Sequence, residues 1–267
     1  IFFSLFFYIY SGVSNLILLI AEILWVYFCT KNKFLKKNIL FSIGVLLLIL
    51  IFFKYYNQFF LIFSNEGFLG KVIMPIGISF FTFQMISYLV DSKKEKGKTL
   101  ELKELFCFIT FFPQLVSGPI VRVSQIINPL KKINKYVLTY NKLKNAICLF
   151  LIGLSIKVLL ADNLAKLSSL SNNSLINVSY HEFIFIILSF SIQIYLDFFG
   201  YTICAIGLGK LFGLRLPQNF KSPYKSLNPV EFWRRWHITL SNWLRDYVYI
   251  PLGGNKKYTK NIFIVFF

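Results

Sequence analysis

The chain has 267 residues, of which 56% are hydrophobic and 19% aromatic, and its mean hydropathy of +0.63 is too high for a water-soluble domain of this size. The formal net charge of +18 comes mainly from lysines between apolar runs, as expected of cytoplasmic loops under the positive-inside rule. A nucleic-acid binder would instead carry this charge along one polar face. Composition therefore predicts an integral membrane protein and excludes a nucleic-acid partner.

Apolar runs long enough to cross a bilayer follow one another from the start of the chain. The first, Phe2 to Phe28, has room for a helix break at Gly12 and contains the acid Glu22. The next two run from Ile39 to Phe63, with an interruption at Lys54-Tyr-Tyr-Asn, and from Val72 to Val90. Lysine-rich loops at their ends predict which side faces the cytoplasm.

The apolar segment from Leu105 to Val121 contains Pro113 and the pair Gly118-Pro119. These residues release backbone groups that lipid cannot satisfy, so we expect a re-entrant or broken segment buried in protein.

Two further spans are expected at Asn145 to Leu160, where Asp162 is placed to cap the next helix, and at Phe183 to Leu208. A polar loop from Ser168 to Ser179 separates them. The second span contains Asp197, and an acid within a span is either functional or the structural partner of a cation, here an arginine. Both alternatives stay open.

The four cysteines lie far apart, without CxxC or Cys-His spacing, so we expect free thiols and neither a disulfide framework nor a metal site. The chain begins at Ile1 and ends inside an apolar run, and we therefore expect a fragment cut at both ends. Composition and spans together predict an all-α, polytopic transmembrane helical bundle with re-entrant or broken segments.

The stretch from Leu214 to Asn255 contains four of the five arginines, three of the four tryptophans and one of the two histidines. Arginine offers a planar, permanently charged fork of donors, which suits a fixed polar network or an anionic ligand. The second histidine, His181, begins a span without matching chemistry around it, so we expect a structural role at the interface.

Within this stretch, Glu231 to Tyr247 shows helical periodicity. Asn228-Pro229 is typical of a helix start, and Pro251-Leu-Gly-Gly of a stop. Glu231 is placed to pair with Arg235 one turn later. The apolar stripe of this segment consists of Phe232, Trp236, Leu240, Trp243 and Tyr247. On this pattern alone we expect an interfacial amphipathic helix that contacts membrane lipid with its aromatic and arginine side chains.

The segment FWRRWHITLSNWLRDYVYIPLGGN (Phe232 to Asn255) resembles the signature of the membrane-bound O-acyltransferase (MBOAT) family, in particular the bacterial branch that acetylates alginate and peptidoglycan. Four earlier segments resemble further motifs of this branch in the same order: MPIGISFFTFQMISYLVD (Met74 to Asp91), FFPQLVSGPIVR (Phe111 to Arg122), IKVLLADNLA (Ile156 to Ala165), and QIYLDFFGY with AIGLG (Gln193 to Gly209). The match departs from the family pattern at Phe199, where a small residue is usual, and at Ile203, where an Asp is usual.

The resemblance implies a single MBOAT-type transmembrane domain over residues 1–267, with helices around a funnel or tunnel. It is incomplete, because the family's invariant histidine lies in a later apolar segment, so we expect the fragment alone to be inactive. It implies no bound cofactor, acetyl-CoA as the acyl donor on the cytoplasmic side, an exported acetyltransferase partner protein, and a polysaccharide acceptor such as alginate or peptidoglycan. The expected location is the bacterial inner membrane.

His237 is the leading candidate for a catalytic residue, because O-acyl transfer needs a base for the acceptor hydroxyl and a neutral imidazole suits that role. The resemblance makes it the companion of the family's invariant histidine. Five other residues of the stretch, together with Asp197, are candidates for substrate or tunnel contact or for structural support. The five are Arg234, Arg235, Arg245, Trp236 and Asp246. For the arginines the alternatives are anchoring the helix and meeting an anionic donor.

Two other functions stay open. A D-alanyl transferase for teichoic acid would take its acyl group from a carrier protein. The motif YIPLGG (Tyr249 to Gly254), however, looks more like that of the acetylase branch. A transporter or scaffold would use the same broken helices as a pathway without covalent chemistry.

Overall fold

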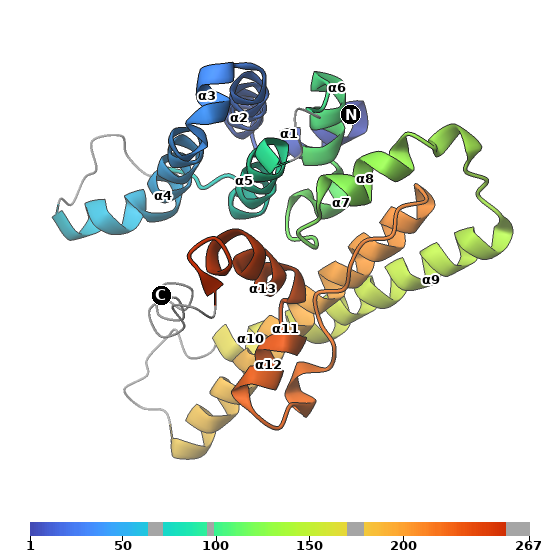
Figure 1. Cartoon of the computed structure of the whole chain (residues 1–267). Helices are drawn as coiled ribbons and strands as arrows, with labels where there is room; N and C mark the ends of the chain where they lie inside the picture. The colour runs from blue at the N-terminus through green and yellow to red at the C-terminus, as the bar shows by residue number, and fades with distance from the viewer. Residues whose placement is uncertain (64–71, 95–98, 170–178, 255–267) are drawn as a thin grey trace. The chain divides into compact units, whose positions relative to one another are not determined.

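The computed structural model describes residues 1–63, 72–94, 99–169 and 179–254. In these ranges the chain forms helices and no β-strand, which confirms the predicted all-α class (Figure 1). It packs as two compact units. The first unit comprises Ile1–Val116, Ile120–Asn128 and Asn242–Phe267, and the second comprises Ser117–Pro119 and Pro129–Ser241. A single family domain over residues 1–267 stays a prediction.

Eight of the α-helices in the described ranges lie wholly or mainly in the first unit. They are α1 (Phe2–Ile9), α2 (Val13–Lys31), α3 (Lys33–Lys37), α4 (Ile39–Phe63), α5 (Ile78–Lys94), α6 (Leu102–Ile109), α7 (Phe112–Leu115) and α8 (Val123–Leu130). Gly12, with φ of 113°, separates α1 from α2, as predicted. Glu22 is only 1% exposed, so it faces the interior of this unit.

Helix α4 continues through Lys54-Tyr-Tyr-Asn, so the predicted interruption is wrong. The Asn57 side chain points out of the helix, where it donates to the Val72 carbonyl at 2.6 Å and accepts from the Val72 N–H at 3.0 Å. These bonds give the polar side chain its partners without breaking the helix ladder.

Helix α5 begins at Ile78, later than the predicted start at Val72. The turn before it contains Gly77 with φ of 77°, and a Cβ there would lie 2.3 Å from the Leu115 carbonyl oxygen. Only glycine fits this close approach to α7. The predicted break between Leu105 and Val121 is confirmed, because α6 ends at Ile109 and α7 is four residues long.

The second unit is built on two long helical runs. Its elements are η1 (Ile133–Lys135), α9 (Tyr140–Ser155), the π-helical η2 (Ile156–Ala161), α10 (Asp162–Ser169), α11 (Tyr180–Leu211), η5 (Pro223–Lys225) and α12 (Pro229–Arg235). Asp162 has helical backbone angles and continues the run from η2 into α10, so the predicted role of Asp162 as a helix cap is wrong. Most of the predicted loop from Ser168 to Ser179 lies outside the described residues.

Helices α9 and α11 approach each other at glycines. A Cβ on Gly153 would lie 2.6 Å from both the Cys204 nitrogen and the Gly200 carbonyl oxygen, and a Cβ on Gly207 would lie 2.8 Å from the Ala146 carbonyl oxygen. Small residues that allow such backbone contact are typical of helix pairs in membranes, where apolar side chains gain nothing by leaving lipid.

Four helices among the described residues are long and apolar enough to cross a membrane: Val13–Lys31, Ile39–Gln58, Tyr140–Leu167 and Tyr180–Leu211. This confirms the multi-pass prediction. The first half of α11 exposes Phe183, Phe185 and Leu188, side chains that water would disfavour and lipid accommodates. The predicted span from Val72 to Val90 is reduced to α5, whose 17 residues begin after the Gly77 turn.

Candidate functional site

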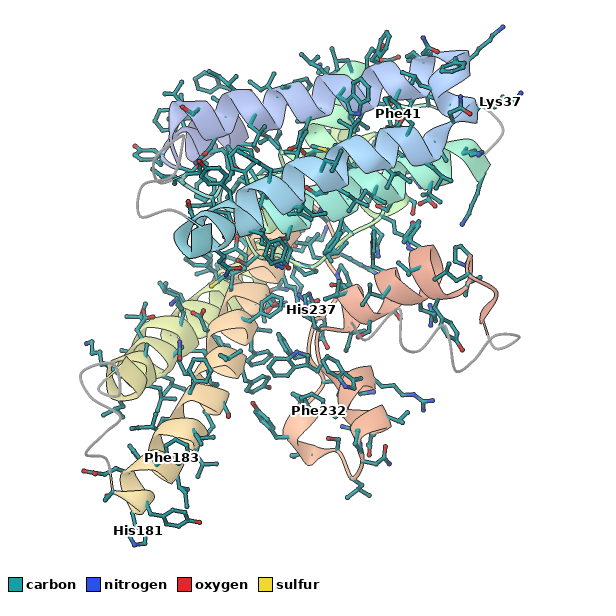
Figure 2. The ribbon with its side chains drawn as sticks, turned by 90° about the vertical axis from the view of Figure 1, so that its left-hand side faces the viewer. Lys37, Phe41, His181, Phe183, Phe232 and His237 are labelled. Atoms are coloured by element: carbon teal, nitrogen blue, oxygen red, sulfur yellow. The ribbon has the colours of Figure 1, made fainter. Side chains whose placement is uncertain are left out.

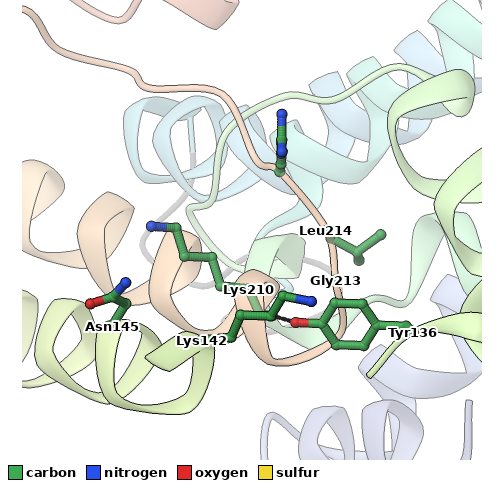
Figure 3. A pocket seen from close by; sticks show the side chains of 7 residues that line it. Tyr136, Lys142, Asn145, Lys210, Gly213 and Leu214 are labelled. Atoms are coloured by element: carbon green, nitrogen blue, oxygen red, sulfur yellow. Dashed lines mark hydrogen bonds between the residues drawn. The ribbon is translucent and has the colours of Figure 1, made fainter. Parts of the chain in front are cut away.

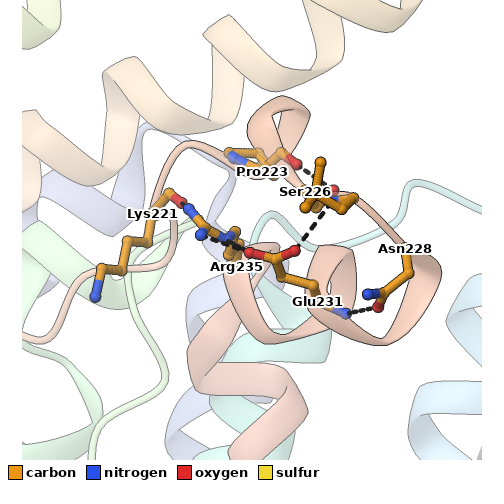
Figure 4. Close-up of polar contacts among 7 residues, drawn as sticks. Lys221, Pro223, Ser226, Asn228, Glu231 and Arg235 are labelled. Atoms are coloured by element: carbon orange, nitrogen blue, oxygen red, sulfur yellow. Dashed lines mark hydrogen bonds and ion pairs between the residues drawn. The ribbon is translucent and has the colours of Figure 1, made fainter.

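Helix α12, within the arginine- and tryptophan-rich stretch, begins with a well-formed cap. The Asn228 side chain accepts a hydrogen bond from the Glu231 N–H at 2.9 Å, and Pro229 occupies the first helical position, where an N–H is not needed. Glu231 accepts two hydrogen bonds from Arg235, at 2.6 and 3.0 Å, so the predicted ion pair is confirmed (Figure 4). The Leu227 N–H and Arg235 lower the pKa of Glu231.

Arg235 also donates to the Lys221 carbonyl oxygen at 3.2 Å. Its guanidinium therefore ties the helix to the loop that precedes it. Arg234 points to solvent, and within the described ranges its side chain makes no hydrogen bond or ion pair. The two neighbouring arginines thus differ: Arg235 anchors α12, and Arg234 is available to a ligand.

The predicted continuous helix from Glu231 to Tyr247 is wrong. Helix α12 ends at Arg235, and the chain continues as α13 (Ile238–Leu244) and the π-helical η6 (Arg245–Tyr249). Trp236 has extended backbone angles and His237 has φ of 42°, in the left-handed region. The periodic stripe did not reveal this break, because the side-chain spacing continues across it.

The break is held by the segment before η5. Backbone hydrogen bonds join the Lys221 N–H to the Arg235 carbonyl and the Ile238 N–H to the Asn219 carbonyl, both at 2.9 Å. The last carbonyl of α12 and the first N–H of α13 thus find backbone partners in the preceding loop instead of in a continuous helix ladder. The left-handed residue His237 lies between these two bonds.

Asn219 fixes the turn with its side chain. It is fully buried, accepts a hydrogen bond from the Thr239 hydroxyl at 2.5 Å, and approaches the Thr202 hydroxyl of α11 at 3.3 Å. The amide thereby connects α11, the loop and α13. A buried amide with partners on two helices restricts the position of the residues between them.

The His237 ring lies against α11, with its centroid 4.7 Å from that of Phe198 in an edge-to-face arrangement (Figure 2). Burial lowers the pKa of His237 from 6.5 to about 4. The imidazole is therefore neutral at pH 7, and a neutral imidazole can accept a proton from a hydroxyl group. His181, at the start of α11, is exposed and away from this turn (Figure 2).

Aromatic rings surround Trp236 next to His237. Trp236 stacks on Phe232 at 5.5 Å with an angle of 16° between the rings, and it meets Phe220 edge-on at 5.0 Å. Tyr195 of α11 stacks on Phe199 at 5.4 Å and contacts the same Trp236. Phe199, where the family usually has a small residue, thus forms part of the support for this aromatic cluster.

Arg245 and Asp246 belong to the first unit, where a different polar network forms. Arg122 forms an ion pair with Asp246, and Arg245 pairs with the same carboxylate at 2.9 Å. Tyr247 donates a hydrogen bond to Asp91 at 2.6 Å, and Arg122 and Lys94 lie over its ring. Burial, together with the Asp91 carboxylate, raises the pKa of the Tyr247 hydroxyl.

The apolar stripe predicted from Phe232 to Tyr247 is divided between the two units. Trp243 packs on Phe83 of α5 at 4.6 Å and donates to its carbonyl oxygen at 3.0 Å, within the first unit. Phe232 and Trp236 belong to the second unit. The stripe therefore reflects packing within protein, in addition to the lipid contact that periodicity alone suggests.

Asp197 forms an ion pair with Lys157 at 2.6 Å, and Lys157 also pairs with Asp162 at 2.5 Å. The expected partner of Asp197 was an arginine, and that detail is wrong. The cation comes from the π-helical turn η2. In a π-helix, residues five positions apart lie on the same face, which brings Lys157 and Asp162 together.

Several residues of these networks were missed by sequence reasoning. Asn219 and Thr202 lie outside the periodic segment and carry no charge, and Arg122 and Asp91 stand at the ends of two motifs whose spatial proximity the sequence does not encode. Among the described residues, no group of three His, Cys, Asp or Glu side chains is placed to hold a metal ion.

Together these features describe a multi-pass helical membrane protein with a partly buried, neutral histidine at a helix break. Residues 24–267 match the model of MBOAT, the membrane-bound O-acyltransferase family. The chain belongs to this family, and the resemblance seen in its motifs is confirmed.

Individual relatives agree with this membership. The chain is 36% identical to the peptidoglycan O-acetyltransferase of Helicobacter pylori, over 95% of this chain and 55% of that protein. It is 37% identical to the probable alginate O-acetylase AlgI of Pseudomonas putida, over 97% of this chain and 56% of that protein. A teichoic acid D-alanyltransferase of Bacillus subtilis is 32% identical over 72% of this chain and 49% of that protein. The chain thus spans about half the length of the curated relatives it matches.

Proposed function

We propose that the full-length protein is a membrane O-acetyltransferase that transfers an acetyl group to hydroxyl groups of a cell-envelope polysaccharide such as peptidoglycan or alginate. The observation that carries this proposal is the similarity to an O-acetyltransferase and an O-acetylase along nearly the whole chain, at 36% and 37% identity. We place the protein in the bacterial inner membrane, where envelope polysaccharides are accessible from one side and thioester donors from the other.

The proposed chemistry assigns the first step to His237. Its neutral imidazole accepts the proton of the acceptor hydroxyl as the oxygen attacks the thioester carbonyl, and the thiol then leaves with the proton. The edge-on contact with Phe198 orients the His237 ring, and the Asn219 bridge fixes the turn that carries His237. A base that is already oriented lowers the entropic cost of reaching the reactive geometry. Acetyl-CoA is the proposed donor, with no resident cofactor, and an exported acetyltransferase is the proposed partner.

The second candidate is D-alanyl transfer to teichoic acid. The D-alanyltransferase of Bacillus subtilis supports it, although its similarity covers 72% of the chain against 95% for the peptidoglycan enzyme. Both candidates use the same acyl-transfer step and differ in the donor, the acyl group and the acceptor. A transporter or scaffold without covalent chemistry ranks third, because the named relatives are transferases.

The test is the ester content of the envelope in a deletion strain complemented with the complete gene. Acetate and D-alanine are released by mild base and quantified separately for wild type, His237→Asn and the matched control His181→Asn. Acetate should disappear on deletion, return with wild type and His181→Asn, and stay absent with His237→Asn at equal protein level. Loss of D-alanine alone would select the second candidate, and no loss of either ester would reject O-acyl transfer to the envelope.

A further inference from the structure

The second unit contains a surface pocket of about 300 Å³ that the acyl-transfer chemistry does not use (Figure 3). It is formed where the start of α9 meets the end of α11 and the loop that follows. The residues that line it are Tyr136, Lys142, Asn145, Lys210, Gly213, Leu214 and Arg215. Its volume is at the lower end of the range typical of small-ligand sites.

The lining carries three cations, Lys142, Lys210 and Arg215, and no acid. The second unit has only four acidic residues, and each has a partner elsewhere. Asp162 and Asp197 pair with Lys157, Glu231 pairs with Arg235, and Glu182 accepts hydrogen bonds from Ser179. Within the described ranges, the side chains of Lys210 and Arg215 form no hydrogen bond or ion pair. The positive charge of the pocket is therefore not neutralised by the fold.

The wall of the pocket is fixed by Tyr136. Its hydroxyl donates to the Lys210 carbonyl oxygen at 2.8 Å, and the same oxygen accepts from the Gly213 N–H at 3.1 Å, at the end of α11 (Figure 3). Gly213 has φ of 71°, and a Cβ there would lie 2.8 Å from the Tyr136 ring. Lys142 lies over the other part of this ring at 4.6 Å and donates to the Val137 carbonyl at 2.9 Å. The backbone of Lys210 and Gly213 and the side chain of Lys142 are thus all held against Tyr136.

The start of α9 adds to the positive potential. Lys142 stands in its first turn, where the N–H groups of a helix are free and its dipole favours an anion, and Asn145 stands in the second turn. The Asn145 amide offers an uncharged donor next to the three cations. A guanidinium fork, ammonium groups and an amide on one concave surface match the several oxygens of a phosphate group better than the two oxygens of a carboxylate.

We propose that this pocket binds the phosphate group of an anionic phosphate ester. Two sources have this chemistry: the headgroup of an anionic phospholipid, and a soluble phosphate ester such as coenzyme A. The proposal stands on the geometry of the pocket and does not depend on the proposed transferase activity.

The test uses the full-length protein and a charge-matched pair of variants. The pocket variant carries Lys210→Gln and Arg215→Gln. The control variant carries Lys221→Gln and Lys225→Gln, which removes the same charge from exposed positions of the same unit outside the pocket. All four side chains are exposed, so both variants should unfold at the wild-type temperature, and this is measured first. Arg215→Lys, which keeps the charge and removes the fork, should give an intermediate effect.

Two arms distinguish the sources. In phosphatidylcholine nanodiscs, titration calorimetry measures the affinity for coenzyme A and for inorganic pyrophosphate. In nanodiscs that also contain phosphatidylglycerol, native mass spectrometry counts the phosphatidylglycerol molecules retained per protein. An affinity at least tenfold lower in the pocket variant than in the control identifies a soluble ester. The loss of a retained lipid from the pocket variant alone identifies a headgroup. The proposal is overturned if the pocket and control variants behave alike in both arms, or if wild type binds none of the probes.

Discussion

His237 combines a left-handed backbone with a partly buried imidazole, two features that each cost free energy and that the surrounding structure must hold. Asparagine is the non-glycine residue that tolerates this backbone region best. His237→Asn therefore removes the imidazole and keeps the turn, which makes it a sharper probe of chemistry than an alanine at the same position.

The lowered pKa of His237 predicts a dependence of stability on pH. Between the unfolded value of 6.5 and the folded value of about 4, the unfolded chain binds a proton that the folded protein does not. The stabilising contribution is therefore complete above pH 6.5 and is lost as the pH falls toward 4.

Thermal unfolding of the full-length protein in detergent should show this loss as a fall in Tm from pH 7 to pH 5. The fall should be smaller for His237→Asn, because the titrating group is absent. Equal falls in wild type and His237→Asn would show that the histidine is not held neutral. His181→Asn, at an exposed position, should follow wild type.

Asn219 is predicted to support the turn. Asn219→Ala leaves the Thr202 and Thr239 hydroxyls without their shared partner, so the free energy of unfolding should fall by about 1–3 kcal/mol. Denaturant unfolding measures the change. Asn228→Ala, which removes the α12 cap outside this bridge, should cost about 1 kcal/mol and leave the His237 pH dependence intact. If Asn219→Ala also left that pH dependence unchanged, the bridge would not position the histidine.

At the residue scale the sequence predicted the Glu231–Arg235 pair and an ion pair for Asp197, because opposite charges at helical spacing and an acid within an apolar run mark them. The catalytic role of His237 stays a prediction. The sequence could not predict Asn219 or the partner Lys157. Their hydrogen bonds join residues 17 to 40 positions apart through the folded arrangement of α11, and an isolated Asn or Lys carries no local signal of such a partner.

At the scale of helices, α9 and α11 depend on glycine contacts that a matched pair of substitutions can test. Gly153→Ala places a Cβ within 2.6 Å of α11, so it should destabilise the full-length protein by about 1–3 kcal/mol in spite of the better helix propensity of alanine.

Gly44→Ala in α4 is the control, because within the described structure the added Cβ meets no atom within 4 Å apart from the adjoining backbone of its own helix. It should stabilise the protein by about 0.5–1 kcal/mol through helix propensity. Unfolding in mild detergent measures both variants. A stabilising Gly153→Ala would show that the two helices do not pack this closely.

Hydropathy predicted the long helices well, and the ends of α4 agree with the sequence to the residue. It failed at Trp236–His237 and at Asp162. In the first case the apolar spacing continues across a break that backbone hydrogen bonds from Asn219 and Lys221 stabilise. In the second, a π-helical turn carries the helix past a residue that would otherwise cap it. Both outcomes depend on tertiary partners.

At the scale of the whole molecule, the residues singled out in one stretch divide between two compact units. Arg234, Arg235, Trp236 and His237 belong to the second, and Arg245 and Asp246 to the first. One continuous motif therefore forms two separate local structures. The first is the turn at His237 beside α11, and the second is the network of Arg245, Asp246 and Tyr247 beside α5. Family membership and the all-α class could be predicted from motifs and composition, whereas this division could not, because α13 continues across the boundary.

The most direct test of the proposed function is acyl transfer by the full-length protein in inverted membrane vesicles supplied with radiolabelled acetyl-CoA. Base-labile label should appear in the envelope acceptor with wild type and with His181→Asn. His237→Asn should lower the initial rate by about 100-fold or more, as expected when a general base is removed. Label transfer by His237→Asn at the wild-type rate would contradict the assignment of the base, and no transfer by wild type would contradict the acetyltransferase itself.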